Sequence, residues 1–283
     1  MNTSDLHRIR HWFPSFVAGF AGPDGSIHNT HKVKQAHSTR VAGHCVAIAS
    51  QLGWDSGHIA AAEALGLLHD VGRFPQFLRF GTLFDAKSID HGELGREVVI
   101  GSGLLSASNA AERQAILCGI CHHNRLLLPD CAGPEAKAFL KLVRDADKLD
   151  IIRVIGELVT TGAFRQFPEL LLHIDPAGPV SASLVEDIAC RKPTSYTKVK
   201  SLADMQLMHV SWIYDLNYAA SCALFSSMRL LAGIRSALPD TAELRELFSM
   251  AENDLAKMAS LPPASAANNP DTSPTEGRRC RHE

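Results

Sequence analysis

Helical spacing of apolar residues runs through most of the chain and constrains its fold more than any other feature. Val33, Val41 and Ile48, for example, recur on one face of a predicted helix over residues 33–52. No stretch of useful length alternates apolar and polar residues as a strand does, and no repeat is visible. We therefore expect an all-α fold, a single compact helical bundle. The same spacing predicts further helices over residues 56–70, 91–104, 109–123, 135–158, 181–190, 201–236 and 241–260, with short helical turns in a loop at 74–90.

Both ends of the chain differ from this helical pattern. Pro14, Pro23 and Gly25 divide residues 1–32 into short pieces, which we expect to form an N-terminal lead-in. From residue 261 onward proline, asparagine and serine dominate, so residues 261–283 cannot bury a core and are predicted to be a disordered tail.

Composition narrows the functional classes. Hydrophobic residues make up 46% of the chain, enough for a large core, and the formal net charge of −2 gives no basic footprint for nucleic acid. No apolar run approaches the roughly 20 residues that span a bilayer, and the N-terminus lacks the pattern of a secretory signal. We expect a cytoplasmic protein that acts on a small molecule, with no nucleic-acid or membrane partner. Its oligomeric state is not encoded in any pattern.

One cysteine motif needs separate treatment. The stretch Cys118-Gly119-Ile120-Cys121-His122 matches the Cys-x-x-Cys-His spelling of haem attachment. Attachment requires export, however, and this stretch lies inside an apolar helical pattern. Buried helix cysteines are therefore the preferred interpretation, and a redox dithiol is disfavoured by the same context.

The chain contains 14 histidines, an unusually high count for its length. A single histidine on an apolar helix face is more often a hydrogen-bonded core residue than a ligand. Here five histidines and two aspartates together lie in otherwise apolar helical segments, and this ensemble predicts a metal site. Imidazole and carboxylate ligands suit Mn, Fe, Co, Ni or Zn, whereas Ca and Mg prefer oxygen ligands. The residues are His37, His69, Asp70, His91, His122, His123 and Asp147.

These residues stand in five short motifs whose order is informative. The motifs are His37-Ser38-Thr39-Arg40-Val41, Leu68-His69-Asp70-Val71-Gly72-Arg73, His91-Gly92-Glu93, His122-His123-Asn124 and Ala146-Asp147-Lys148-Leu149-Asp150. In this order they resemble the HD-domain superfamily of metal-dependent phosphohydrolases, and the additional histidines resemble its dinuclear subset. The resemblance covers residues from about 30 to 155 and implies a compact helical bundle with the metal site at its centre. The segments 73–76 and 84–91 resemble a stand-alone bacterial HD hydrolase group.

The resemblance implies a ligand set for two divalent transition-metal ions. His37, His69, Asp70 and Asp147 would hold the first ion. Asp70 would bridge to a second ion, which is also held by His91 and by His122, His123 or both. Asp145 competes with Asp147, which is preferred because Ala-Asp-Lys-Leu matches the family phrase.

Two neighbouring residues have supporting interpretations. Asp150, one turn beyond Asp147, is expected to contact a ligand histidine from behind. His44 lies on roughly the same helix face as His37 and is either a similar supporting residue or part of the core.

The implied chemistry is attack on phosphorus by a metal-activated water. Asp70, Arg73 and Lys148 are the expected catalytic residues, and Arg73, Arg125 and Lys148 are expected to contact the substrate phosphate. For Arg125 and Lys148 a solvated surface charge is an equally good interpretation.

The resemblance also suggests a division of the chain. Residues 33–158 would be the HD-domain metal-binding core, and residues 159–260 a helical extension that forms the wall or lid of the pocket. Aromatic residues in the extension either stack on a substrate ring or belong to the core. They are Tyr196, Trp212, Tyr214 and Tyr218, with Asp215 and Asn217 nearby.

The preferred function is hydrolysis of a small phosphorylated metabolite, for which we expect a nucleotide, by a phosphohydrolase or phosphodiesterase. The alternatives are a mixed-valent di-iron oxygenase of the same fold and a non-catalytic HD regulatory module. Asn124-Arg125-Leu126 follows the paired histidines without a Gly-Tyr-Pro motif, which disfavours cleavage of cyclic di-GMP. Val33 stands where some relatives carry a carboxylate for a third metal, so we expect at most two ions.

Overall fold

The computed structural model describes residues 1–129, 133–167, 169 and 174–262. Within these ranges the chain consists of helices and connecting loops, and a single bridge between Asp175 and Ser201 is the only extended pairing. The prediction of an all-α fold is confirmed. Almost all of the predicted tail, residues 263–283, lies outside the described residues, and so does its histidine, His282.

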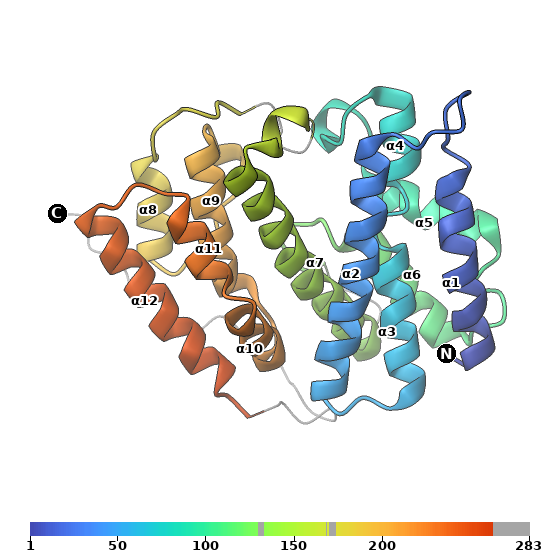
Figure 1. Cartoon of the computed structure of the whole chain (residues 1–283). Helices are drawn as coiled ribbons and strands as arrows, with labels where there is room; N and C mark the ends of the chain where they lie inside the picture. The colour runs from blue at the N-terminus through green and yellow to red at the C-terminus, as the bar shows by residue number, and fades with distance from the viewer. Residues whose placement is uncertain (130–132, 168, 170–173, 263–283) are drawn as a thin grey trace.

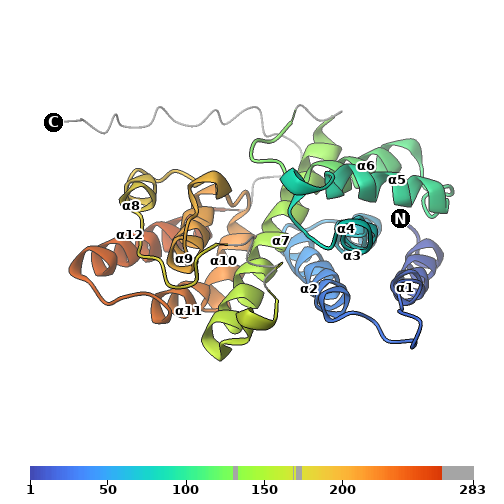
Figure 2. The same cartoon turned by 90° about the horizontal axis from the view of Figure 1, so that it is seen from above.

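The long helix α7 (Pro134–Thr161) runs through the middle of the molecule. Figures 1 and 2 show one group of helices on one side of α7 and a second group, formed by the later part of the chain, on the other. The first group comprises α1 (Thr3–Ala18), α2 (Asn29–Gln51), α3 (Ser56–Leu68), α4 (Arg73–Phe80), α5 (His91–Ser102) and α6 (Ala110–His122). The second comprises α8 (Ala182–Ala189), α9 (Leu202–Ser211), α10 (Ala219–Ser227), α11 (Leu230–Ser236) and α12 (Ala242–Ala259).

The predicted break-up of the N-terminal lead-in is wrong for residues 3–18, which form the continuous helix α1 despite Pro14. Ile9, Phe13 and Val17 are buried on one face of this helix at helical spacing. Burial of this apolar face offsets the hydrogen bond that a proline inside a helix removes. The predicted interruption at Pro23 and Gly25 is present as the loop before α2.

The single helix predicted over residues 201–236 is also wrong. The chain instead forms α9, the short 3-10 helix η5 (Trp212–Asp215), α10 and α11. The backbone is extended at Leu216 and Tyr218, and the backbone N–H groups of Asn217 and Tyr218 donate to the buried carboxylate of Asp145 on α7. This tertiary contact, which periodicity cannot reveal, ends the helical run. In the predicted loop at 74–90, the eight-residue helix α4 is longer than the short turns expected there.

Two close backbone contacts bring the first group of helices together. A Cβ at Gly66 on α3 would lie 2.5 Å from Ala42 Cα on α2, and a Cβ at Gly72 would lie 2.1 Å from the carbonyl oxygen of His91. Only glycine permits these distances. As a result, the end of α3 and the start of α5 meet beside α2.

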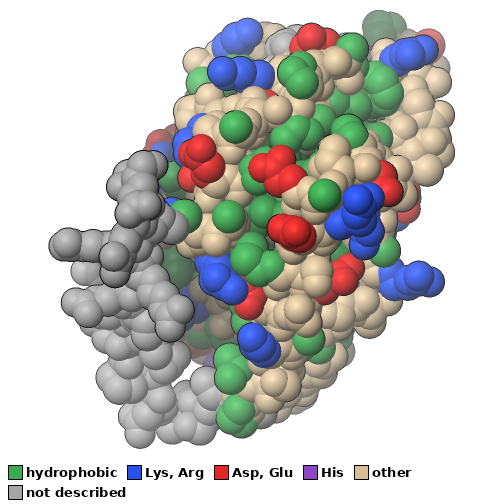
Figure 3. Space-filling view, turned by 90° about the vertical axis from the view of Figure 1, so that its left-hand side faces the viewer, with side chains coloured by type: hydrophobic (Ala, Val, Ile, Leu, Met, Phe, Trp, Pro, Cys, Tyr) green, Lys and Arg blue, Asp and Glu red, His purple; other side chains and the backbone are tan. Residues whose placement is uncertain are grey.

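The outer side of the second group carries charges of both signs. Figure 3 shows this side with acidic and basic side chains interspersed among small hydrophobic areas. Helix α12, which lies on this side in Figure 1, forms ion pairs through Arg245 with Asp240 and through Asp254 with Arg191. No helix among the described residues is long and apolar enough to cross a bilayer.

Candidate metal centre

Six of the seven predicted ligand residues come together where α7 packs against the first helix group, and they come from five places in the chain. His37 lies within α2, and Asp147 lies within α7. The others lie at helix ends, where the backbone turns them inward: His69 and Asp70 follow α3, His91 begins α5, and His123 follows α6. All except the part-buried Asp147 are buried. We call these six residues the metal cluster.

His122 does not join the metal cluster. Its ring is only part-buried, and it belongs to none of the groups of potential ligand atoms among the described residues. The structure therefore separates the two members of the predicted pair and brings only His123 toward Asp70.

Asp70 stands between two halves of the cluster. Its Oδ2 lies 3.6 Å from His37 Nε2 and 3.7 Å from His69 Nε2. Its Oδ1 lies 3.3 Å from His91 Nε2 and 3.6 Å from His123 Nε2. Each carboxylate oxygen thus faces a different pair of imidazole nitrogens, so Asp70 is shared between the two halves.

Asp147 completes the first half. Its Oδ1 lies 3.0 Å from His37 Nε2 and 3.5 Å from His69 Nε2. In the second half, the Nε2 atoms of His91 and His123 lie 3.0 Å apart. The potential ligand atoms of His37, His69 and Asp70 lie within 4.8 Å of one another, as do those of Asp70, His91 and His123. Those of His69, His123 and Asp147 form a third such group, which connects the two halves.

Backbone carbonyls fix the rings of two cluster histidines. His69 Nδ1 lies 2.8 Å from the carbonyl oxygen of Gly66, and His123 Nδ1 lies 2.8 Å from that of Ile120. A carbonyl only accepts, so Nδ1 carries the hydrogen and Nε2 presents its lone pair to the cluster.

Carboxylates hold the other two rings. His37 Nδ1 lies 2.7 Å from Asp150 Oδ2, and His91 Nδ1 lies 2.6 Å from Asp85 Oδ2. Asp150 thus contacts a cluster histidine from behind, as expected, whereas His44 Nε2 lies 4.0 Å from this carboxylate. Carboxylates behind ligand histidines are a recurring feature of metal sites.

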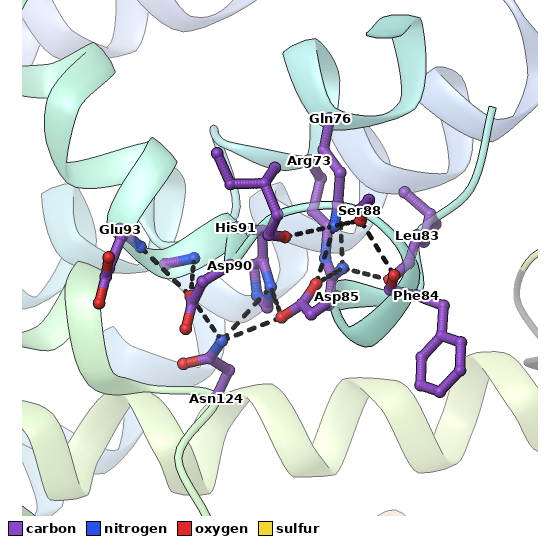
Figure 4. A network of polar contacts seen from close by, with 12 residues as sticks. Arg73, Gln76, Leu83, Phe84, Asp85, Ser88, Asp90, His91, Glu93 and Asn124 are labelled. Atoms are coloured by element: carbon purple, nitrogen blue, oxygen red, sulfur yellow. Dashed lines mark hydrogen bonds and ion pairs between the residues drawn. The ribbon is translucent and has the colours of Figure 1, made fainter. Parts of the chain in front are cut away.

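Figure 4 shows how Asp85 is itself held. Arg73 Nη1 and Gln76 Nε2 donate to its Oδ1 at 2.8 Å, and Asn124 Nδ2 donates to its Oδ2 at 3.1 Å. Burial alone would raise the pKa of Asp85, but His91 and Arg73 hold it well below its usual value. The carboxylate behind His91 is therefore ionised and fixed in position.

Three buried atoms of the metal cluster, His37 Nε2, His69 Nε2 and Asp147 Oδ1, make no hydrogen bond of suitable geometry to any described residue, although the two nitrogens lie 3.0 and 3.5 Å from the oxygen. Buried polar atoms are nearly always partnered in folded proteins. Nitrogen and oxygen donors that converge without partners fit a divalent transition metal. The residues present therefore fit the ion that the sequence predicts.

The protonation states of the metal-cluster residues are also those that metal ligands need. Burial would raise the pKa of Asp70, but Lys34 and His69 hold it well below its usual value. Contacts with His37 and His69 do the same for the pKa of Asp147 against its burial. Burial, with the charge of Arg73, lowers the pKa of His91 to about 4. At neutral pH the two carboxylates are charged and His91 is neutral, as metal binding requires.

Cationic side chains surround the cluster. Lys34 Nζ lies 2.8 Å from Asp70 Oδ2, and Arg73 Nε lies 3.5 Å from Asp70 Oδ1. Sequence reasoning missed Lys34, although its place three residues before His37 puts it on the same helix face. Arg73 also holds Asp85, so it positions the cluster as well as facing it.

The two other predicted phosphate contacts already have acidic partners. Lys148 Nζ lies 2.7 Å from Asp215 Oδ2. Arg125, which is half-exposed, pairs with Asp90 at 2.8 Å and Glu93 at 3.1 Å. Like Arg73, both line the cavity described below.

Asp145, the competing carboxylate, points away from the metal cluster. It accepts hydrogen bonds from the backbone N–H of Asn217 at 2.9 Å, from Asn217 Nδ2 at 2.8 Å and from the backbone N–H of Tyr218 at 3.2 Å. Burial raises its pKa. Its contacts join α7 to the second helix group.

A cavity of about 370 Å³ opens at the metal cluster, and residues of the first helix group, of α7 and of the second helix group line it. Tyr196 and Trp212, two of the four predicted aromatic candidates, line it. Tyr214 instead contacts Asp254 through its hydroxyl, and Tyr218 donates to the carbonyl oxygen of Ala138.

A comparison with protein families identifies the region that holds these residues. The family model described as HD domain matches residues 35–152, a span that includes all six residues of the metal cluster. No curated protein and no solved structure matches the chain.

Proposed function

We propose that this chain, whose residues 35–152 form an HD domain, is a metal-dependent phosphohydrolase or phosphodiesterase that acts on a small phosphorylated metabolite, for which we expect a nucleotide. One observation carries the proposal. Four buried histidines turn Nε2 toward Asp70 and Asp147, while an acceptor behind each ring engages its Nδ1.

The residues would divide between two ions. His37, His69 and Asp147 would hold one, His91 and His123 the other, and Asp70 would contribute one oxygen to each. Divalent ions in such a site lower the pKa of a coordinated water and neutralise charge on phosphoryl oxygens. Because each Asp70 oxygen faces a different pair of histidines, Asp70 would help to hold both ions.

Protein groups supply orientation and charge. Lys34 and Arg73 lie on the cavity side of Asp70 and would bind phosphoryl oxygens, which fixes the ester for in-line attack. Lys148 would add a third positive charge, with its ammonium positioned by Asp215. The buried helices around the cluster restrict the access of bulk water, which strengthens these charge interactions.

The complete cluster favours catalysis over a non-catalytic regulatory module, which has no need for converging, unpartnered ligand atoms. A di-iron oxygenase would use the same ligands, so only the reaction catalysed distinguishes it from a phosphohydrolase. Oxygen uptake by iron-loaded protein, without phosphate release from manganese-loaded protein, would favour it.

The proposal is tested by metal analysis followed by a screen of nucleotides, cyclic nucleotides and sugar phosphates with Mn, Fe, Co, Ni and Zn. We expect bound metal and release of phosphate or alcohol from at least one ester. Asp70→Ala should abolish both, because it removes an oxygen from each half of the cluster. Asp240→Ala, which removes an exposed carboxylate far along the chain, should leave both unchanged. A metal-replete protein that hydrolyses no ester in the screen would contradict the proposal.

A further inference from the structure

The cavity lining changes character along α7. Asp147 and Lys148 line its charged part, and Ile151, Val154 and Ile155 continue the same helix face as an apolar wall. Asp147 and Val154 are seven residues apart, about 10 Å along the helix axis. The cavity therefore extends from the metal cluster by a length comparable to a sugar ring with an attached base.

Helix α9 and the segments beside it form the facing wall. Met205 and His209 on α9, Trp212 in η5 and Tyr196 in the 3-10 helix η4 (Tyr196–Lys198) all line the cavity. None of these residues belongs to the span matched by the HD-domain model. We call these four residues the distal wall.

His209 is the unusual member of the distal wall. Only 1% of the residue is exposed, and within the described residues its buried Nδ1 has no hydrogen-bond partner. The cluster histidines differ, because each of their Nδ1 atoms is engaged by an acceptor. A buried polar atom without a partner is costly to the protein, and His209 is the residue of the distal wall that carries one.

The state of His209 suits a neutral ligand. Burial lowers the pKa of His209 to about 3, so the ring is uncharged at neutral pH. A neutral imidazole offers one donor and one acceptor. One neutral ring nitrogen that donates or accepts a single hydrogen bond suits an uncharged ring atom better than it suits a phosphate.

The neighbouring rings provide flat apolar surfaces. The Trp212 ring packs against His209 with centroids 4.8 Å apart, and Tyr196 packs against Trp212 at 6.1 Å. Tyr196 is 45% exposed and therefore stands at the mouth of the cavity. Aromatic faces with a single polar group are typical of sites for planar rings.

We propose that the distal wall binds the planar heteroaromatic group of a phosphoester whose phosphate lies at the metal cluster, and that His209 selects this group through a hydrogen bond. The placement of the phosphate at the metal cluster rests on the proposed function. The binding of the ring to the distal wall does not, because it requires no hydrolysis.

The first test compares esters that share a phosphate but differ in the alcohol. Metal-loaded protein should show a kcat/KM at least about tenfold higher for AMP, CMP or UMP than for glycerol 1-phosphate or glucose 6-phosphate. His209→Phe keeps a flat ring of similar size but removes the hydrogen bond. It should lower kcat/KM for the preferred nucleotide by roughly 10- to 100-fold, mainly through KM, and leave glycerol phosphate unaffected.

Two further variants separate recognition from folding. His209→Gln, which keeps a donor and an acceptor, should recover part of the loss. His31→Phe is the matched control, because His31 is also buried among aromatic rings but does not line the cavity. The nucleotide preference of this variant should equal that of the parent protein. If His209→Phe does not fold, Tyr196→Ala at the exposed mouth decides the question, since the same weakening for nucleotides is expected.

The second test measures binding without chemistry. Adenosine, cytidine and uridine, which lack phosphate, should change the fluorescence of Trp212, and Trp212→Phe should remove this change. Ring binding that His209→Phe weakens, without hydrolysis of any ester, would reject the proposed function and support the distal wall as a ring site. Hydrolysis with no preference for ring-bearing esters and no effect of His209→Phe or Tyr196→Ala would support the function and overturn this inference.

Discussion

At the scale of single residues, the group behind each histidine ring decides which nitrogen faces the metal cluster. Carbonyls of the preceding turn orient His69 and His123, and carboxylates from other elements orient His37 and His91. The carbonyl partners are in place as soon as the helix end forms. The carboxylate partners depend on tertiary packing, and the position of Asp85 depends in addition on the hydrogen bonds shown in Figure 4.

Asp85→Asn should therefore weaken metal binding although Asp85 lies outside the metal cluster. The variant keeps the shape of the side chain but loses the charge that fixes the tautomer of His91. Loss of such a partner typically lowers metal affinity about 10- to 100-fold. Calorimetric titration with Mn or Zn measures the change, and unchanged affinity would show that Asp85 has no part in orienting His91. Asp24→Asn, in an exposed loop, is the control and should bind metal as the parent protein does.

His209 also predicts a dependence of stability on pH. Its pKa is about 3 when folded, against an ordinary value of 6.5, so the unfolded chain binds a proton that the folded chain does not. Stability therefore falls as the pH drops below 6.5, by about 2 kcal/mol between pH 7 and pH 5 for this group alone. Urea unfolding of metal-free protein at both pH values should show a smaller drop for His209→Phe than for the parent chain. Equal drops would contradict this assignment.

Sequence patterns identified the members of the metal cluster and a part of their surroundings, namely Asp150 and Arg73. His37, His69, Asp70, His91 and Asp147 are brought together as expected, while their binding of metal stays a prediction. Spacing left the choice between His122 and His123 open, because adjacent helix residues point about 100° apart and only the backbone after α6 decides between them. Lys34, Asp85 and His209 were missed because their roles depend on contacts between elements distant in the sequence.

At the scale of elements, α7 carries two carboxylates that contact different parts of the molecule. Asp147 and Asp145 are two residues apart, so they point about 200° apart around the helix. Asp147 faces the metal cluster, and Asp145 binds the backbone before α10. One helix thus joins the metal cluster to the second helix group.

Asp145→Ala should destabilise the fold without weakening metal affinity. The change leaves the donors of Asn217 and Tyr218 unpaired, which should cost about 3 kcal/mol. Asp147→Ala should give the opposite pattern, with lost metal binding and a smaller effect on the stability of the metal-free protein. Chemical denaturation together with metal titration of both variants checks this. Loss of metal binding in Asp145→Ala would reverse the assignment of the two carboxylates.

Element boundaries were predictable where local signals determine them. The end of α2 at Gln51 and the start of α3 at Ser56, which Asp55 caps, agree with the helix ranges predicted from the sequence. The split of residues 201–236 was not predictable, because the bonds from Asp145 come from another helix. The continuity of α1 through Pro14 shows the converse, since burial of its apolar face outweighs a local helix breaker.

At the scale of the whole molecule, bound metal should stabilise the fold. The ligands come from α2, α7 and the ends of α3, α5 and α6, so unfolding destroys the site. Ligand at 100 times its Kd stabilises by about 2.7 kcal/mol, which corresponds to a rise in Tm of roughly 5 to 10 °C for a chain of this size. Thermal melts with metal and with chelator should show this difference, and Asp70→Ala should melt at the same temperature in both. If the Tm of the parent protein were the same with metal and with chelator, the interpretation of the cluster as a metal site would be contradicted.

The cavity has one further consequence, which concerns how proteins with this architecture diversify. Its charged end is built within residues 35–152, and its distal wall comes from helices beyond that span. If the distal wall binds the substrate as proposed, mutations in α9 and η5 would alter which molecule is admitted while the metal cluster stays intact. Substrate choice and chemistry would then be encoded in separate stretches of the gene, and a new specificity would not require an inactive ancestor.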